Sequence, residues 1–198
     1  VAVIGMPVYS GRIPTHCAEM LAKLKGTNTP AIAVVVYGNR DYDDALLELT
    51  DILTNNGFLV YGAGAFVAQH SIFPSVGKAR PDQSDFHQIA DFARQCAIKL
   101  EQTAGNEKPI NVKGNSPYKK IVPVPLRPSA DNNCISCGIC ANVCPSGAIN
   151  KENPKLTDKH LCISCATCIT ICPQKARNFR GILDKVFGKL FARMCRNR

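Results

Sequence analysis

Three apolar runs in the first half of the chain alternate with segments whose apolar residues recur at helical spacing. The runs cover residues 1–6 (VAVIGM), 31–38 (AIAVVVYG) and 58–68 (FLVYGAGAFVA). Each has the near-continuous apolar character of a strand that is buried on both faces of a sheet. Because each run is followed by a helical pattern, the order predicts a parallel sheet with right-handed crossovers, an α/β fold.

The predicted helices have recognisable ends. They cover residues 15–26 (THCAEMLAKLKG), 41–57 (DYDDALLELTDILTNNG) and 85–100 (DFHQIADFARQCAIKL). The first stops at Gly26, and the second starts with Asp41 as N-cap and ends at Gly57 in the position after its C-cap. The third places its apolar residues on one face, namely Phe86, Ile89, Ala90, Ala93, Cys96, Ala97 and Leu100.

The chain begins within an apolar run. Val1 is not a methionine, and no polar segment comes before it. An apolar strand without a neighbour would form an exposed edge that favours aggregation. We therefore expect that a longer protein has lost, or been trimmed of, its first strand-helix-strand unit.

A proline-rich segment separates the predicted first domain, residues 1–102, from the rest. Residues 103–130 contain five prolines at positions 109, 117, 123, 125 and 128, and they show neither helical nor alternating spacing. This composition predicts an extended linker. We expect a second domain over residues 131–176 and a basic amphipathic helix over residues 177–198.

A cysteine motif occurs twice in the second domain. CISCGICANVCPSGAI begins at residue 134 and CISCATCITICPQKAR at residue 162, a period of 28 residues. Both have the form C-x2-C-x2-C-x3-C-P, in which three cysteines wrap three corners of a [4Fe–4S] cube from one loop. The fourth cysteine, followed by proline, points away, and in the bacterial two-cluster arrangement it binds the other cluster.

This arrangement predicts two ligand sets. One set is Cys134, Cys137, Cys140 and Cys172, and the other is Cys162, Cys165, Cys168 and Cys144. Zinc is the alternative metal, but its structural sites use two C-x2–4-C pairs and have no use for a third step followed by Cys-Pro. The segment resembles the bacterial two-cluster ferredoxins. The resemblance implies a small α+β ferredoxin-like domain that transfers single electrons at low potential.

Two loops after the first two apolar runs are candidate ligand sites, because ligands of an open parallel sheet bind at the carboxyl ends of its strands. The loops are PVYSG at residues 7–11 and YGNRDYDDA from residue 37. They resemble the ring-binding loops in the back part of a flavodoxin-like domain. The resemblance implies that Pro7, Val8, Tyr9, Ser10 and Gly11 line one side of the FMN ring, and Gly38, Asn39, Arg40 and Tyr42 the other. Tyr42 would stack on the ring. The alternative is that Tyr9 and Tyr42 merely terminate strands.

The flavodoxin resemblance has a gap. A flavodoxin holds the FMN phosphate in a turn after its first strand, and no such turn precedes Val1. By this resemblance the chain supplies strands 3, 4 and 5 only of the parallel sheet. We therefore expect FMN to bind only with the missing N-terminal segment. The order of domains resembles a bacterial and archaeal family in which a flavodoxin-like domain is fused to a two-cluster ferredoxin.

Cysteine content and charge add a location and a candidate surface. Eleven cysteines, eight of them at metal-ligand spacing, argue for a reducing compartment, and we expect the cytoplasm. The net charge is +9, but residues 174–198 hold eight Lys or Arg and one Asp and so carry +7 of it. A basic amphipathic helix over 181–198 suits an anionic membrane surface or an acidic partner. The alternative is a helix that packs its apolar face on the rest of the protein.

These patterns favour an electron carrier over an enzyme, and they identify no catalytic residue. Single electrons would pass between the clusters, FMN and a redox partner protein. The alternative is a flavin-dependent reductase of a small substrate that is fed through the clusters. The sequence lacks basic faces interleaved with aromatic residues, so we expect no nucleic-acid partner.

Overall fold

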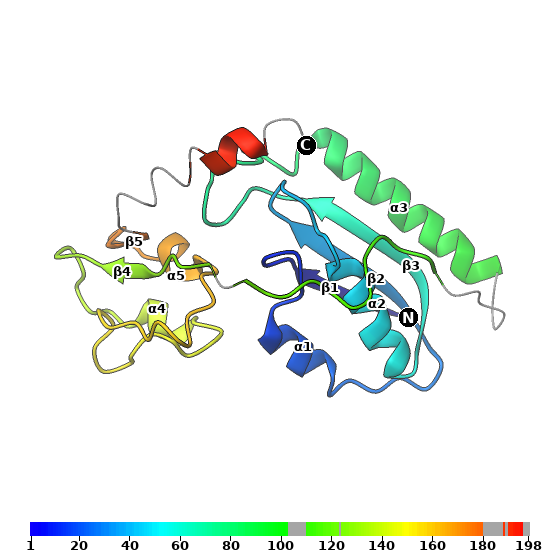
Figure 1. Ribbon diagram of the computed structural model, residues 1–198, viewed down its shortest axis with the longest axis horizontal. Coiled ribbons are helices and arrows are strands. Elements are labelled where there is room, and N and C mark those ends of the chain that lie inside the picture. Colours follow the sequence, from blue (N-terminus) through cyan, green and yellow to red (C-terminus); the bar gives the residue numbers. More distant parts are fainter. Residues whose placement is uncertain (103–109, 123, 180–187, 189, 196–198) are drawn as a thin grey trace. The chain divides into compact units, whose positions relative to one another are not determined.

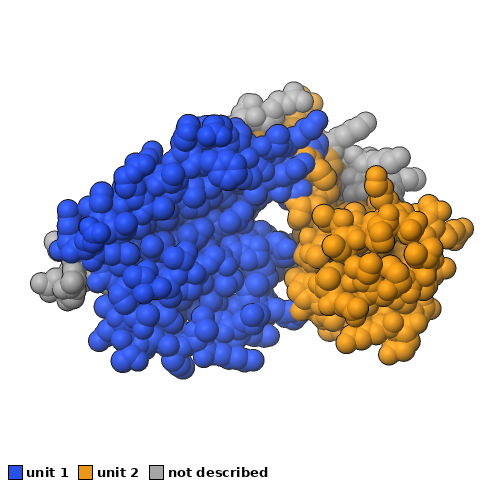
Figure 2. All heavy atoms as spheres, turned by 180° about the vertical axis from the view of Figure 1, so that it is seen from behind, with its two compact units in different colours: residues 1–70, 75–122, 198 blue, residues 71–74, 123–197 orange. Residues whose placement is uncertain are grey.

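The computed structural model describes residues 1–102, 110–122, 124–179, 188 and 190–195, and these form two compact units (Figure 1). Within the described part, unit 1 comprises residues 1–70 and 75–122, and unit 2 comprises residues 71–74 and those from 124 onward (Figure 2).

Unit 1 is an α/β unit around a three-stranded parallel sheet. Its strands are β1 (Ala2–Pro7), β2 (Thr29–Tyr37) and β3 (Phe58–Val67), and they are adjacent in chain order. Its helices are α1 (Thr15–Leu21), α2 (Ala45–Asn55) and α3 (Gln83–Gln102). Figure 1 shows α1 and α2 on one face of the sheet and α3 on the other. The predicted parallel sheet and its strand order are confirmed.

The core of unit 1 lies between the sheet and α2. Ala31, Ala33 and Val35 point to this face of β2 and are fully buried. Leu49 and Leu53 of α2 pack in the same cluster and are also fully buried. Burying each leucine contributes about 1.5–3 kcal/mol, so this layer holds the sheet and the loops at its carboxyl end in place.

A bulge in β3 changes which residues face this core. Ala31 of β2 pairs with Val60, and the next residue, Ile32, pairs with Gly62, so Tyr61 is an extra residue in the ladder. The bulge shifts the alternation by one position. As a result, Val60 and Ala63 both pack against the core cluster although they are three residues apart.

On the opposite face of β3, a glycine allows α3 to approach closely. A Cβ at Gly62 would overlap the Sγ of Cys96, a buried residue of α3. Phe92 of α3 lies edge-on to Phe66 of β3, with ring centroids 5.3 Å apart. The helix therefore packs through Phe92 and Cys96, whereas Phe86 of the predicted apolar face is 54% exposed. The predicted face is thus partly wrong, because the contact surface offered by β3 sets the rotation of the helix.

Three further expectations for unit 1 are wrong in detail. Val3 of β1 is 69% exposed, so this strand is not buried on both faces. Helix α1 ends at Leu21 rather than at Gly26, because the chain tightens there into a turn in which Leu24 N–H donates to Leu21 O. Helix α2 begins at Ala45, so its N-cap is Asp44 and not Asp41. The predicted role of Gly57 is confirmed, since it follows the C-cap of α2 with φ of +85°.

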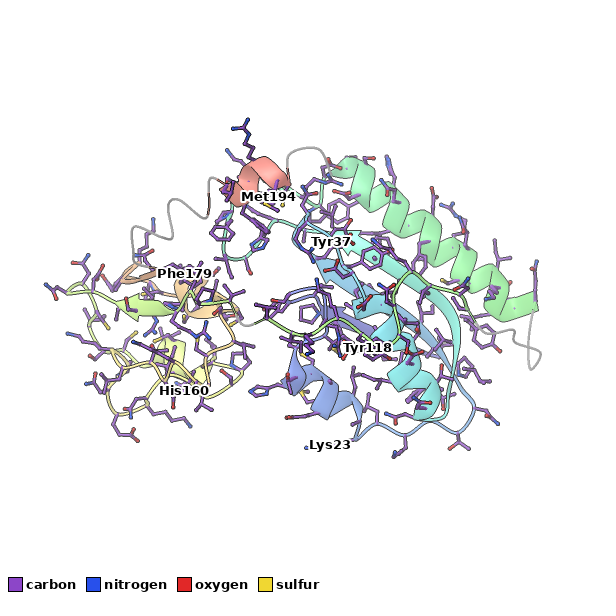
Figure 3. The ribbon with its side chains drawn as sticks, in the orientation of Figure 1. Lys23, Tyr37, Tyr118, His160, Phe179 and Met194 are labelled. Atoms are coloured by element: carbon purple, nitrogen blue, oxygen red, sulfur yellow. The ribbon has the colours of Figure 1, made fainter. Side chains whose placement is uncertain are left out.

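Residues 110–122, within the expected linker, pack on unit 1 and form what we call the strap. The Asp44 carboxylate accepts the backbone N–H groups of Asn115 and Lys119, at 2.8 and 2.7 Å. The Tyr118 hydroxyl donates to Asp51 of α2 at 2.5 Å, and Figure 3 labels Tyr118 beside this helix. This part of the segment is therefore fixed to α2 and to the loop before it.

Unit 2 contains two short helices and a two-stranded antiparallel sheet. The helices are α4 (Ile139–Asn142) and α5 (Thr167–Thr170), and the strands are β4 (Pro128–Ala130) and β5 (Arg177–Phe179). β4 lies in the expected linker, and β5 lies where the sequence predicted the start of the basic helix. The two strands extend the expected domain of residues 131–176 on both sides, because their pairing joins its two ends.

The expected basic helix over 177–198 lies largely outside the described residues. Residues 190–194 are helical, and the ring of Phe191 lies 5.3 Å from that of Phe73. Leu190 and Met194, which the sequence placed on the same apolar face, are 56% and 64% exposed. Among the described residues, no helix has both the length and the hydropathy that crossing a bilayer requires.

Candidate metal centre

The sequence repeat in unit 2 is also a repeat of backbone conformation. Six residues with positive φ form three pairs at the 28-residue period: Ser136 and Ser164, Gly138 and Ala166, and Gly147 and Lys175. Five of the six carry a side chain or sit beside one, and a non-glycine residue in this region costs roughly 1–3 kcal/mol. Gly138 and Ala166 are the N-caps of α4 and α5. Each left-handed residue therefore turns a cysteine loop into the short helix that follows.

The eight cysteines of the repeat line two pockets. Cys134, Cys137, Cys140 and Cys172 line what we call the first pocket, and Cys144, Cys162, Cys165 and Cys168 line the second. The two pockets are nearly equal in size, about 330 and 340 Å³ including their open mouths. In each pocket, three cysteines come from one half of the repeat and the fourth comes from the other half. The structure thus brings together the same two groups that the sequence predicted.

The fourth cysteine of each motif accepts a backbone hydrogen bond. The N–H of Ala148 donates to Cys144 Sγ, and the N–H of Ala176 donates to Cys172 Sγ, both at 3.3 Å. Burial alone raises the pKa of the Cys144 thiol, but hydrogen bonds from Ser146 and from the backbone near Ala148 hold it below its usual value. Hydrogen bonds to sulfur stabilise the thiolate, which is the form that binds metal.

The surroundings of the two pockets differ. Cys137 in the first motif is exposed, whereas Ser164 in the corresponding loop of the second motif is 4% exposed. The Ser164 hydroxyl donates to Leu126 O at 2.5 Å and lies 2.8 Å from a guanidinium nitrogen of Arg127. The segment before β4 therefore covers the second loop.

Arg177 is a residue of the first pocket that the sequence analysis missed. It is 1% exposed and lies at the start of β5, where the sequence predicted a solvated basic helix. Burial raises the pKa of the Cys168 thiol in the second pocket, and Arg177 opposes this rise. Aligning the two halves reveals the residue, because Ile149 occupies the equivalent position 28 residues earlier.

The cysteines stand around the pockets rather than in tight groups. Among the described residues, no three His, Cys, Asp or Glu side chains gather as the ligands of a single metal ion would. All eleven cysteines lie in the described part of the chain, and each is a free thiol.

A comparison with protein families identifies this region. Residues 133–177 are a 4Fe-4S dicluster domain. The match covers both cysteine motifs and extends into β5. Comparisons with curated proteins and with solved structures found no match to the chain. The dicluster domain supports a role for the protein in iron–sulfur electron transfer.

The first predicted flavin loop follows β1 in a fixed conformation. Val8 N–H donates to Val36 O at 3.0 Å, and Tyr9 and Arg12 form an isolated antiparallel bridge. Ser10 has φ of +54°, and its hydroxyl donates to Val122 O of the strap at 2.9 Å. The hydroxyl that the resemblance assigned to the flavin side of this loop is therefore bonded to the strap.

A buried ion pair that the sequence analysis missed supports this loop from below. Arg12 donates two hydrogen bonds to the carboxylate of Glu48, at 2.7 and 2.8 Å. The same carboxylate accepts the N–H of Ile13 at 3.0 Å, and Glu48 is 6% exposed. Glu48 is a polar position on the buried side of α2, but its partner lies 36 residues away and leaves no local pattern.

The second predicted loop lies at the same edge of the sheet and touches the first, since Asp44 N–H donates to Gly11 O at 3.1 Å. Tyr42 was expected to be an exposed residue that stacks on a flavin. Its ring instead packs against the core, 5.6 Å from the ring of Tyr37, with the Lys113 ammonium 4.9 Å from its centroid. Arg40 forms an ion pair with Asp43. The two loops are thus close to each other, and the strap contacts both.

His70 lies beside the second loop, against Gly38. Burial, with a smaller contribution from the charge of Arg40, lowers the pKa of His70 to about 4. Its backbone N–H donates to Val76 O at 3.0 Å. The imidazole is therefore neutral at physiological pH.

Proposed function

We propose that the protein is a one-electron carrier in which the two pockets each hold one [4Fe–4S] cluster. The ligands would be Cys134, Cys137, Cys140 and Cys172 in the first pocket, and Cys144, Cys162, Cys165 and Cys168 in the second. The observation that carries the proposal is the crossed lining of the two pockets, which is the ligand pattern of two-cluster ferredoxins. When bound, each cluster takes up and releases one electron at a time.

The residues around the thiols fit such clusters. The N–H groups of Ala148 and Ala176 already point at cysteine sulfurs, and hydrogen bonds of this kind raise the reduction potential. Ile149 and Ile163 line the second pocket, and Ile135 and Ile139 the first, so apolar side chains limit the access of water to each. The chain supplies ligands, hydrogen bonds and a low-dielectric wall for its clusters.

Iron analysis and one variant test this proposal. The anaerobically purified protein is expected to contain eight irons per chain and to absorb broadly near 400 nm, whereas zinc without iron would refute the proposal. Cys144→Ala is expected to disturb the cluster of Cys162, Cys165 and Cys168, although Cys144 belongs to the first motif. The matched control is Cys17→Ala in α1, which lines neither pocket and should leave the iron content unchanged.

We further propose that unit 1 belongs to a flavodoxin-like domain and exchanges electrons with FMN at the loops after β1 and β2. The support is the parallel order of the strands and the position of both loops at one edge of the sheet. The phosphate-binding turn would come from an upstream segment. Hydrogen bonds to a charged phosphate are worth roughly 1.5–3 kcal/mol each. Residues 1–198 alone are therefore expected to bind FMN weakly, and a form extended upstream tightly.

A flavin titration tests the second proposal. Tight FMN binding by residues 1–198 would contradict the phosphate argument. Failure of the reduced, upstream-extended protein to reduce bound FMN would contradict the electron exchange. Turnover of a small substrate at the flavin would favour a reductase over a carrier. Cysteine usage and cluster chemistry lead us to propose the cytoplasm as the location, and a redox protein as the partner.

A further inference from the structure

Arg177 is a buried cation in the wall of the first pocket. Its guanidinium donates to two carbonyl groups, Pro154 O at 2.7 Å and Pro128 O at 3.3 Å. It also donates to the Thr157 hydroxyl at 2.5 Å, and one of its nitrogens lies 3.9 Å from Cys140 Sγ. Its hydrogen-bond partners other than this sulfur are neutral.

The charge of Arg177 is not balanced by a carboxylate. None of the ion pairs among the described residues includes it. Its Nε is buried and finds no acceptor in the described part of the chain. Burying an unpaired charge costs several kcal/mol, and an unsatisfied buried N–H adds to that cost. The cysteine thiolates of the first pocket, with the cluster they would hold, are the anionic group that offsets it.

The second pocket has no such cation at the equivalent position. Ile149 lines the second pocket and stands 28 residues before Arg177, which lines the first. The two pockets are alike in their cysteines and in their Sγ hydrogen bonds. They therefore differ in charge more than in ligands.

We propose that Arg177 raises the reduction potential of the cluster in the first pocket above that of the second, so that the first electron to enter the domain rests beside Arg177. This inference rests on the proposed two-cluster carrier. Adding an electron makes a thiolate-bound cluster more negative, and a nearby buried cation stabilises the reduced state more than the oxidised state. One electron comes from a chemical reductant such as dithionite, and Arg177 transfers no proton because a guanidinium stays charged.

The test compares reduction potentials in variants of the whole chain. Arg177→Met removes the charge, Arg177→Lys keeps it, and Lys175→Gln removes an exposed charge from the same loop. Anaerobic titrations are followed by electron paramagnetic resonance, and the cysteine β-proton signals in nuclear magnetic resonance spectra assign each step to a pocket.

In the unchanged protein, the first pocket is expected to be reduced first. In Arg177→Met, the ratio of reduced to oxidised cluster in the first pocket should fall about tenfold at a fixed potential, which is about 59 mV for one electron. The second pocket should change less, although Arg177 also acts on Cys168. Arg177→Lys should retain most of the effect. Lys175→Gln should change the ratio less than about twofold, because water screens its charge.

Unchanged potentials in Arg177→Met, or equal shifts in both pockets, would overturn the inference. If Arg177→Met loses its iron, Arg177→Lys decides: retained iron with the order of reduction preserved supports the role of the charge, and lost iron assigns Arg177 a structural role only. Iron in the unchanged protein separates the two proposals. Its absence refutes the carrier, whereas normal iron with unshifted potentials refutes Arg177 alone.

Discussion

Replacing Asp44 by alanine should release the strap from unit 1. The Asp44 side chain is 2% exposed and accepts three hydrogen bonds from the strap. These come from the N–H and the side-chain amide of Asn115, at 2.8 and 3.2 Å, and from the N–H of Lys119, at 2.7 Å. Asp44 is the N-cap of α2 but makes no capping hydrogen bond to its own helix. Its carboxylate therefore serves the strap.

The expected loss follows from these bonds. A hydrogen bond to a charged group contributes about 1.5–3 kcal/mol. The three do not add in full, because the freed strap amides regain water, and we expect Asp44→Ala to lower the free energy of unfolding by about 3–5 kcal/mol. Asp44→Asn keeps the volume but sets an amide donor against two N–H groups, so we expect about 2–3 kcal/mol.

The same bonds predict a pH dependence. Burial alone raises the pKa of the Asp44 carboxyl, but the hydrogen bonds from Lys119 and Asn115 outweigh it and hold the pKa below its usual value. The unfolded chain then binds a proton more readily than the folded one. The stabilisation by Asp44 is therefore present above about pH 4 and is lost as the pH falls through the folded pKa.

Urea unfolding followed by circular dichroism measures the loss, and hydrogen exchange at residues 110–122 locates it. Asp91→Ala is the control, because Asp91 forms an exposed ion pair with Arg94 on α3 and should change stability by less than about 0.5 kcal/mol. A loss below about 1 kcal/mol in Asp44→Ala, or unchanged exchange at Asn115 and Lys119, would refute the reasoning.

Three other predictions concern the rest of the chain. Glu48→Gln should cost about 2–4 kcal/mol in urea unfolding, because it breaks the nearly buried pair with Arg12; a loss as small as that of Asp91→Ala would contradict this. The pKa of His70 of about 4 lies below the unfolded value of about 6.5, so the folded state binds fewer protons between them and loses about 2 kcal/mol by pH 5. His70→Gln should flatten that pH slope, and an unaltered slope counts against it. Deleting residues 181–198 should leave co-sedimentation with anionic vesicles unchanged, whereas lost binding would assign this segment to membranes.

The sequence predicts the features of this fold that depend on neighbouring residues. The order of strands in unit 1 follows from the period of apolar residues, and the grouping of cysteines follows from a motif whose spacing is itself the geometry of a loop. Local sterics also place Gly57 after α2, because a left-handed residue there favours glycine.

Features that depend on distant residues left no such pattern. The pairing of Asp44 with the strap joins positions about 70 residues apart, and a proline-rich composition predicted only an extended segment. The bulge at Tyr61 arises from pairing with β2, and it changes the face of every residue after it. Tyr42 was assigned to a ligand because its contacts with Tyr37 and Lys113 have no periodic spacing.

The small core of unit 2 has a consequence for how the protein is made. Its buried cluster contains Cys140, Ala141, Ile149 and Cys168, two of which are proposed metal ligands, whereas the cluster in unit 1 contains eleven residues. A core of that size rarely sustains folding alone, and metal binding supplies the missing free energy. In an iron-starved cell, the new chain would carry a folded unit 1 beside an open unit 2 that proteases can cut. The amount of intact carrier would then follow the iron supply without a dedicated regulator.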